Sequence, residues 1–212
     1  MSKNGFTQPT NEAKHIVFDL GGVLIDWNPA YLYQRIFRSQ EAMGYFLKNI
    51  CTFEWNEAQD GGRSIADATQ ILVQRFPEYT FEINSFYRFW PEMLGGAITG
   101  TVDLLSRVKS NQNHSLFALT NWSAETFPVA MERFEFLQWF EGILVSGEEK
   151  LKKPDPLFYK RLEEKYALNS SKIVFIDDNL RNIAAAERLG WDVIRFQNPA
   201  LLETEFFNRG LL

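Results

Sequence analysis

The sequence lacks the features of a secreted or membrane-spanning chain. Cys51 is the only cysteine among 212 residues, so no disulfide bond can form within the chain. No apolar run approaches the ~20 residues that a bilayer requires. Residues 1–14 are polar and contain no apolar segment of the kind found in signal peptides. We therefore predict a cytoplasmic protein with no membrane partner.

Clustered positive charge is also missing. The chain has 22 Lys and Arg residues against 27 Asp and Glu residues, a net charge of −5, and no stretch forms a dense basic stripe. Nucleic acids and anionic membranes are bound through such stripes, so we expect no nucleic-acid partner. We expect instead a monomer or homodimer that acts on a small molecule.

Apolar residues are abundant, and 45% of the chain is hydrophobic, enough for a full core and a modest accessory domain.

From residue 95 onward, predicted helices alternate with short apolar strands, the pattern of a right-handed parallel sheet. We predict an α/β fold with a Rossmann-like, doubly wound parallel sheet. Its strands are expected at residues 16–18, 116–119, 142–145, 173–176 and 192–195, and its helices at 102–109, 124–134, 156–166 and 180–189.

A different pattern separates the first strand from the rest of the sheet. Between residues 28 and 94, apolar residues recur at three- and four-residue intervals, and aromatic residues are dense enough to form a small core of their own. We predict a helical bundle inserted as a cap over residues 28–94. The core domain would then comprise residues 15–27 and 95–212, preceded by a flexible tail at 1–14.

The first strand ends in a carboxylate. The apolar run at residues 16–18 leads directly to Asp19, which Leu20, Gly21 and Gly22 follow. Ligands of parallel α/β sheets bind beyond the carboxyl ends of the strands, and glycines let the backbone approach a phosphate or metal closely. Asp19 is therefore a candidate catalytic residue, although an Asp that caps the following turn explains this motif alone equally well.

Three later stretches also place polar residues at the ends of predicted elements. Thr120 and Asn121 follow the strand at 116–119, Asp177 and Asp178 follow the strand at 173–176, and Lys153 precedes the helix at 156–166. Each has a structural alternative, as a helix cap or a solvated surface residue. Parallel strands would bring all of them to one edge of the sheet, and this joint placement favours a functional site.

The charges predict a metal. Asp19, Asp177 and Asp178 would lie within a few ångströms of one another, and each close pair repels by roughly 3–4 kcal/mol at an effective dielectric near 20. Mg²⁺ on oxygen ligands can offset this repulsion. We expect Asp19, the Gly21 carbonyl and Asp178 to hold Mg²⁺, with Asp177 orienting a metal-bound water. A lysine, a threonine hydroxyl and turn amides beside such a metal form a phosphate cradle, here from Lys153, Thr120, Gly21 and Gly22.

These four motifs, in this order and spacing, resemble the haloacid dehalogenase superfamily, specifically subfamily I with a helical C1 cap. The resemblance spans residues 16–198. It implies that Asp19 is a nucleophile that forms an aspartyl-phosphate intermediate, that Thr120 and Lys153 hold the phosphoryl oxygens, and that Asp178 is a metal ligand. We also expect Asn121 to bind the substrate. The implied reaction is Mg²⁺-dependent hydrolysis of a small phosphorylated metabolite.

One position departs from the usual phosphatase pattern. Phosphatases of this superfamily usually carry a second Asp two residues after the nucleophile as general acid and base, and here that residue is Gly21. General acid-base catalysis typically contributes 10²–10⁴-fold, so another group, water or an easier leaving group must replace it. His15 and His114 are expected at the far end of the sheet. Asp26 is the nearest spare acid, although it fits a helix cap as well.

Some bacterial sugar-phosphate phosphatases that the chain resembles share this Asp-x-Gly motif, and a sugar 1-phosphate has an acidic leaving hydroxyl.

An alternative is a metal-free 2-haloacid dehalogenase, in which Asp19 attacks carbon and Arg35 or Arg38 helps to abstract the halide. Retention of both Asp177 and Asp178 disfavours this metal-free enzyme, because three uncompensated carboxylates would repel a carboxylate substrate. A third possibility is a catalytically weak binding protein.

The cap is expected to select the substrate. Trp55 and Arg63 lie near the break at Gly61 and Gly62, where a loop can approach the site. We predict that both contact the substrate. Aromatic residues in such a bundle more often fill its core, so the alternative for Trp55 is a packing position.

Overall fold

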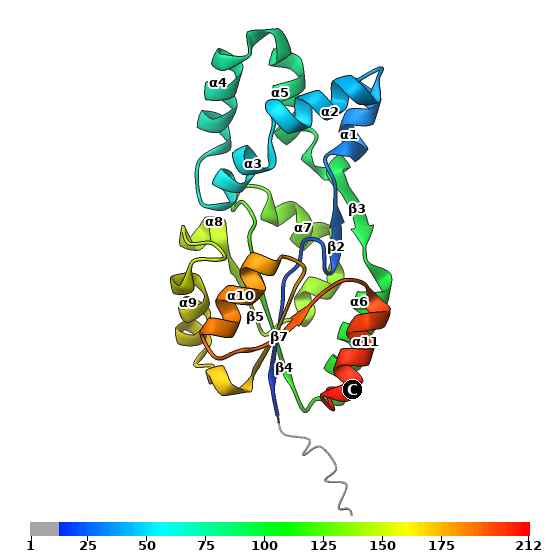
Figure 1. Cartoon of the computed structure of the whole chain (residues 1–212), viewed down its shortest axis with the longest axis vertical. Coiled ribbons are helices and arrows are strands. Elements are labelled where there is room, and N and C mark those ends of the chain that lie inside the picture. Colours follow the sequence, from blue (N-terminus) through cyan, green and yellow to red (C-terminus); the bar gives the residue numbers. More distant parts are fainter. Residues whose placement is uncertain (1–12) are drawn as a thin grey trace, which may run out of the picture.

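The computed structural model describes residues 13–212, and twelve of the fourteen residues of the predicted tail lie outside this range (Figure 1). Five parallel strands form the central sheet in the order β5-β4-β1-β6-β7. Their bounds are His15–Phe18 for β1, Ser115–Thr120 for β4, Gly142–Val145 for β5, Ile173–Asp177 for β6 and Asp192–Arg195 for β7. All five predicted strands are therefore confirmed.

Helices cover both faces of the sheet because its strands are apolar on both sides. Ile16 and Phe18 face one layer, formed by α6 (Thr99–Asn111), α7 (Phe127–Arg133) and α11 (Pro199–Asn208). Val17 faces the opposite layer, formed by α9 (Pro156–Tyr166) and α10 (Leu180–Arg188). This arrangement confirms the predicted doubly wound α/β fold.

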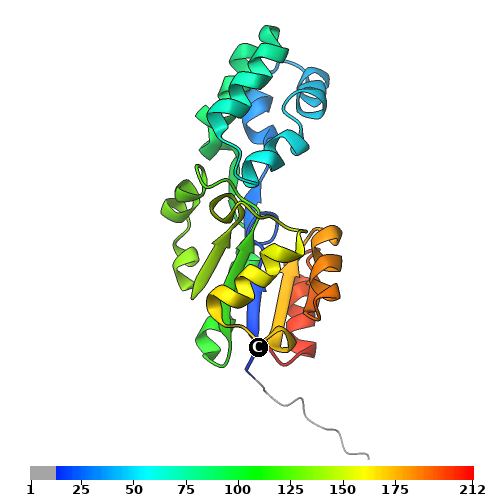
Figure 2. The ribbon, with the colours of Figure 1, turned by 90° about the vertical axis from the view of Figure 1, so that its left-hand side faces the viewer.

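A helical unit stands beyond the carboxyl ends of the strands (Figures 1 and 2). It contains α1 (Ala30–Ile36), α2 (Gln40–Asn49), α3 (Phe53–Asp60), α4 (Ile65–Arg75) and α5 (Thr80–Arg88). Two antiparallel strands, β2 (Ile25–Trp27) and β3 (Leu94–Ala97), connect it to the sheet. We call this unit the cap.

Local sequence explains where the cap helices begin. The side chains of Ser39, Thr52 and Ser64 each accept a hydrogen bond from a main-chain N–H in the first turn of α2, α3 and α4. Such caps satisfy N–H groups that otherwise lack partners at a helix start. The interior of the bundle is aromatic, and the rings of Tyr33 and Phe46 lie 4.9 Å apart.

Four elements differ from the prediction. Helix α7 begins at Phe127 rather than at residue 124, because a turn closed by the Thr126 N–H and the Ser123 carbonyl precedes it. The glycine-rich strand β3 and the short helix α8 (Ser146–Glu149) were not predicted, and α11 lies beyond the last predicted strand. None of the helices in the described range is both long and apolar enough to cross a membrane.

Candidate active site

The sheet brings the predicted motifs to one edge. Phe18 of β1 pairs with Ala118 of β4 and with Ile176 of β6, so Asp19 and Asp177 come directly after the paired residues and Thr120 comes one position further along β4. Asp19, Thr120 and Asp177 consequently meet at the carboxyl end of the sheet. The segment between α8 and α9 adds Lys153, whose ammonium reaches two of these groups.

Lys153 is the buried cation of the site. Its side chain is fully buried, and its Nζ lies 2.9 Å from Asp19 Oδ2 and 2.7 Å from Asp177 Oδ2. Burial opposes the charge of the ammonium, but Asp177 and Asp19 outweigh this effect and raise the pKa of Lys153. Lys153 therefore supplies a fixed positive charge.

Asn121 holds the main chain of Lys153. Its Nδ2 donates to the Lys153 carbonyl oxygen at 2.9 Å, and its Oδ1 accepts from the Lys153 N–H at 2.8 Å. Asn121 also lines the cavity described below. Both ends of its amide are thus engaged in orienting the lysine.

Asp177 is bound by protein groups on both oxygens. It accepts hydrogen bonds from the Asn179 N–H at 2.8 Å, from Asn182 Nδ2 and from Lys153 Nζ. Its carboxylate is fully buried and is not among the groups that line the cavity. Its contacts position Lys153 and Asn182 rather than reach toward a ligand.

Of the three carboxylates at this edge of the sheet, Asp19 and Asp178 face the cavity. One oxygen from each of Asp19, Asp177 and Asp178 lies within 4.8 Å of the other two. Burial raises the pKa of Asp19 to about 7, against the opposing effect of Lys153. Burial and the nearby Asp177 also raise the pKa of Asp178. This concentration of carboxylates around one ammonium suits a hard divalent cation such as Mg²⁺.

The two glycines of the first motif leave room for these groups. Gly22 has φ of +75°, and a Cβ there would lie 2.7 Å from Asp178 Oδ2. Its N–H is bound to the Ile25 carbonyl, so it closes the turn rather than facing a ligand. Gly21 lines the cavity, and a Cβ there would have no heavy atom within 4 Å. A side chain is therefore sterically allowed at Gly21.

Thr120 is a buried hydroxyl that no described residue satisfies. The residue is fully buried at the end of β4, and its Oγ1 has no hydrogen-bond partner within residues 13–212. A buried donor without a partner is costly unless a ligand engages it. Its position beside Asp19 and Lys153 fits an acceptor such as a phosphoryl oxygen.

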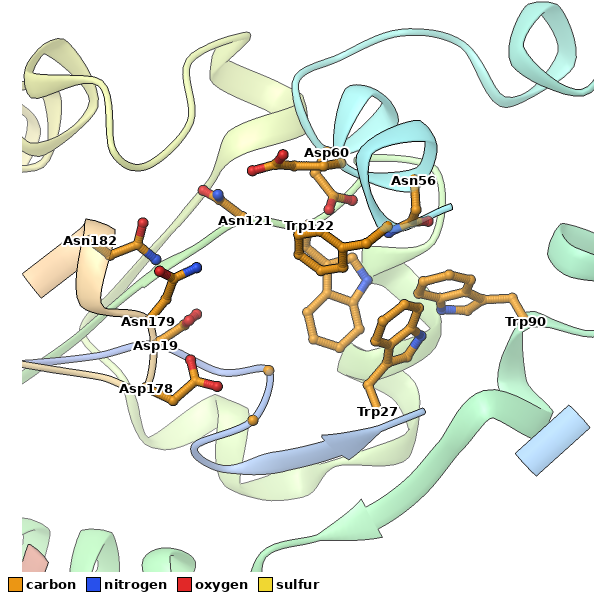
Figure 3. Close-up of a pocket in the computed structure, with 14 residues that line it drawn as sticks. Asp19, Trp27, Asn56, Asp60, Trp90, Asn121, Trp122, Asp178, Asn179 and Asn182 are labelled. Carbon is orange, nitrogen blue, oxygen red and sulfur yellow. The ribbon is translucent and has the colours of Figure 1, made fainter. Parts of the chain in front are cut away.

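A cavity of about 350 Å³ lies between this edge of the sheet and the cap. Asp19 and Asp178 lie on one side of it, Asn56 and Asp60 of α3 lie opposite them, and three tryptophans form a third wall (Figure 3). The rings of two of these, Trp27 and Trp90, are 5.4 Å apart. The complete lining consists of Asp19, Gly21, Gly22, Trp27, Phe53, Asn56, Glu57, Asp60, Trp90, Asn121, Trp122, Asp178, Asn179 and Asn182.

Two residues predicted to contact the substrate lie elsewhere. Trp55 packs its ring against Phe86 and Tyr87 in the cap interior, at 5.2 and 5.5 Å between ring centroids. Arg63 donates to the Gln59 side chain and to the Trp55 carbonyl. Neither lines the cavity. For Trp55 the structure therefore matches the packing alternative, because its helix turns the opposite face toward the core domain.

Asp26 also lies outside the cavity. Its carboxylate accepts a hydrogen bond from the Tyr31 hydroxyl at 2.6 Å. The acidic groups that the cap does bring to the cavity are Glu57 and Asp60. Their helical spacing with Asn56, at i, i+1 and i+4, is the signal that could have identified this face of α3 from the sequence.

The comparison with known families agrees with these motifs. A model of the haloacid dehalogenase-like hydrolases matches residues 13–190. This span includes all four motifs of the site. The chain therefore belongs to the haloacid dehalogenase-like hydrolases, as its sequence predicted.

Two relatives are named phosphatases. The chain is 28% identical over 177 residues to a sesquiterpene phosphatase of Aspergillus oryzae, covering 84% of this chain and 86% of that protein. It is 26% identical over 187 residues to a phosphoglycolate phosphatase of Photobacterium profundum, covering 82% of this chain and 79% of that protein. The fold is similar to that of a HAD family enzyme from Bacteroides thetaiotaomicron solved with magnesium and inorganic phosphate. That similarity has a TM-score of 0.65 at 22% identity and covers 88% of this chain and 95% of the other.

Proposed function

We propose that this hydrolase removes phosphate from a small phosphorylated metabolite in a Mg²⁺-dependent reaction, with Asp19 as the nucleophile. The observation that carries the proposal is the grouping of Asp19, the fully buried Lys153 and the unpartnered Thr120 hydroxyl. A nucleophile beside a fixed cation and a free donor is suited to bind and attack a phosphoryl group.

The chain's residues divide the chemistry between them. Asp19 attacks phosphorus and forms an aspartyl phosphate as the bond to the leaving oxygen breaks. Lys153 and Thr120 hold phosphoryl oxygens in line with this attack, and Asn121 keeps Lys153 in place. Mg²⁺, held by Asp19, Asp178 and the Gly21 carbonyl, would offset the charge that carboxylates and phosphate bring together. Water then releases phosphate and regenerates Asp19.

The relatives support the same reaction class. Two of them are named phosphatases, for a sesquiterpene and for phosphoglycolate. A structural neighbour was solved with magnesium and inorganic phosphate. These names differ in substrate, so the substrate of this chain is inferred from its own cavity.

The cavity favours a sugar phosphate. The indole rings of Trp27 and Trp90 offer flat apolar surfaces, while Asn56 and Asp60 of α3 offer hydrogen-bonding groups on an adjacent wall. Flat apolar faces beside amide and carboxylate groups suit a ring that carries hydroxyls. A haloacid is disfavoured because, in a metal-free dehalogenase reaction, Asp19 and Asp178 would repel its carboxylate with no cation to offset them.

The test is phosphate release from a panel of sugar, alkyl, aryl and prenyl phosphates, each assayed with Mg²⁺ and with EDTA. The proposal predicts Mg²⁺-dependent release, with sugar phosphates ahead of simple alkyl phosphates. Halide release from 2-haloacids is measured in parallel. Halide release without phosphate release would establish the dehalogenase alternative. If neither phosphate nor halide is released, the alternative of a binding protein holds.

A further inference from the structure

One of the two carboxylates that the cap brings to the cavity lies at the end of a helix. Asp60 is the last residue of α3, and it lies across the cavity from Asp19 and Asp178 (Figure 3). Gly61 and Gly62 follow it, and Gly62 has φ of +98°. The helix therefore ends in a tight turn that leaves Asp60 at the boundary between the cap and the core domain.

Direct contacts fix Asp60 to the core domain. Its carbonyl oxygen accepts a hydrogen bond from Ser146 Oγ, and the same Oγ accepts from the Trp122 N–H at 2.9 Å. Trp122 follows Thr120 and Asn121 in the loop after β4. One side chain thus joins the end of α3 to the loop that carries the phosphate-binding candidates.

The surroundings of Asp60 favour its protonated form. Burial is the largest cause that raises the pKa of Asp60, to about 7, and Glu57 adds to it. Lys152 and a backbone hydrogen bond from Ser123 act in the opposite direction, and Tyr87 is the other titratable group nearby. The carboxyl end of a helix also disfavours negative charge. A carboxyl group that is protonated in part near neutral pH can donate a proton.

Other acids of the chain are less well placed. Glu57 shares the cavity, but its carboxylate pairs with Lys152 at 3.4 Å and with Arg181 at 3.6 Å. Asp26 is bound to Tyr31 outside the cavity. His15 and His114 lie at the amino ends of β1 and β4, the far end of the sheet from Asp19. Of the described carboxyl groups that line the cavity, Asp60 remains once the candidate metal ligands Asp19 and Asp178 and the ion-paired Glu57 are set aside.

We propose that Asp60, supplied by the cap, is the general acid and base that replaces the Asp missing at Gly21. The inference rests on the proposed phosphatase function. As Asp19 attacks phosphorus, the bond from phosphorus to the leaving oxygen breaks, and protonated Asp60 gives its proton to that oxygen. Ionised Asp60 then takes a proton from water as the water oxygen attacks phosphorus. The bond to Asp19 breaks, phosphate leaves, and Asp60 is protonated again.

The experiment compares the wild type with Asp60→Asn on phosphate esters graded by leaving-group pKa. Since a basic alkoxide needs a proton to leave, kcat/KM for alkyl and sugar phosphates is expected to fall by about 10²–10⁴-fold. For aryl phosphates with acidic phenols, kcat/KM should change by less than about tenfold, while kcat falls because the second step still needs a base. An unchanged kcat/KM for alkyl phosphates would overturn the proposal.

Two matched variants sharpen the result. Asp26→Asn removes a carboxylate that lies outside the cavity and should leave the leaving-group dependence as in the wild type. Gly21→Asp places a carboxyl where space is free, so the double variant Gly21→Asp with Asp60→Asn should recover much of the lost alkyl activity. Equal effects of Asp60→Asn on alkyl and aryl kcat/KM, without recovery, would mean that Asp60 only shapes the cavity.

A measurement on the wild type covers the case in which Asp60→Asn does not fold. The kcat/KM for alkyl phosphates should fall above about pH 7 relative to that for aryl phosphates, because only the former requires a protonated acid. Parallel pH profiles would contradict the proposal. If the wild type releases no phosphate from any ester, the phosphatase function itself fails. If release depends on Asp19 but not on Asp60, only this inference fails.

Discussion

The Asn121 side chain is bound to Lys153 at both of its polar atoms, through the N–H and the carbonyl oxygen of the lysine main chain. Asn121 follows the strand that ends in Thr120, so the residue that carries the buried cation is tied to the strand beside Asp19. The position of the cation is therefore set by two elements that lie 32 residues apart in the sequence.

Asn121→Ala tests this connection. Loss of both hydrogen bonds should let Lys153 shift, and misplacement by about 1 Å can cost about 10²-fold in rate. We expect kcat/KM to fall by about tenfold to hundredfold. Asn198→Ala is the matched control, because it removes an amide that caps α11 away from the site. It should lower stability by about 1 kcal/mol and leave kcat/KM unchanged. Equal kcat/KM values for the two variants would refute the positioning of Lys153.

Asp178→Ala tests the metal ligands. Few protein groups would hold Mg²⁺, so loss of one carboxylate should raise the Mg²⁺ concentration that gives half-maximal activity by at least about tenfold. The measurement is a Mg²⁺ titration of phosphate release at fixed substrate. An unaltered titration, or a wild-type rate insensitive to EDTA, would show that the metal assignment is wrong.

Asp60→Asn should also change stability in a pH-dependent way. Burial raises the pKa of Asp60 to about 7 from an ordinary value of 3.8. The folded state thus binds the proton more tightly than the unfolded chain, and the contribution of Asp60 to wild-type stability is lost as pH rises from about 4 to about 7. Because asparagine does not titrate, the Tm of the variant relative to the wild type should increase across this window. A Tm difference that is constant with pH would contradict the raised pKa.

Trp27→Ala tests the aromatic wall. Removal of one ring surface should lower kcat/KM for ring-containing phosphates by about tenfold, since contact with an aromatic side chain is worth about 1.5–3 kcal/mol when complete. A small ester such as methyl phosphate offers no ring surface to the wall, and its kcat/KM should change little. Equal losses for both substrates would indicate that Trp27 supports the fold rather than the substrate.

The sequence allowed the sheet, and the edge that carries the candidate site, to be predicted because both depend on local patterns. Buried strands such as the one ending at Asp19 are continuous apolar runs, and parallel order then requires that their ends converge. Strand β3 was missed because Gly95 and Gly96 carry no side-chain pattern. At Gly95 a Cβ would lie 2.2 Å from Asp26 Oδ2, so the glycine is explained by a contact visible only in three dimensions.

The face of the cap that lines the cavity was harder to predict, because it depends on how α3 is rotated against the core domain. Trp55 and Asp60 belong to the same helix, but Trp55 points into the bundle and Asp60 lines the cavity. Helical periodicity places them on different faces without saying which face meets the core domain. Contacts such as the hydrogen bond from Ser146 to the Asp60 carbonyl tie α3 to the core domain, and this bond joins residues 86 positions apart.

The stereochemical course at phosphorus tests the nucleophilic role of Asp19 most directly. With a phosphate ester made chiral by oxygen isotopes and hydrolysed in labelled water, two successive in-line displacements through Asp19 predict net retention of configuration. Asp19→Asn should be folded and inactive in the same assay. Net inversion by the wild type, or phosphate release by folded Asp19→Asn at the wild-type rate, would contradict the account.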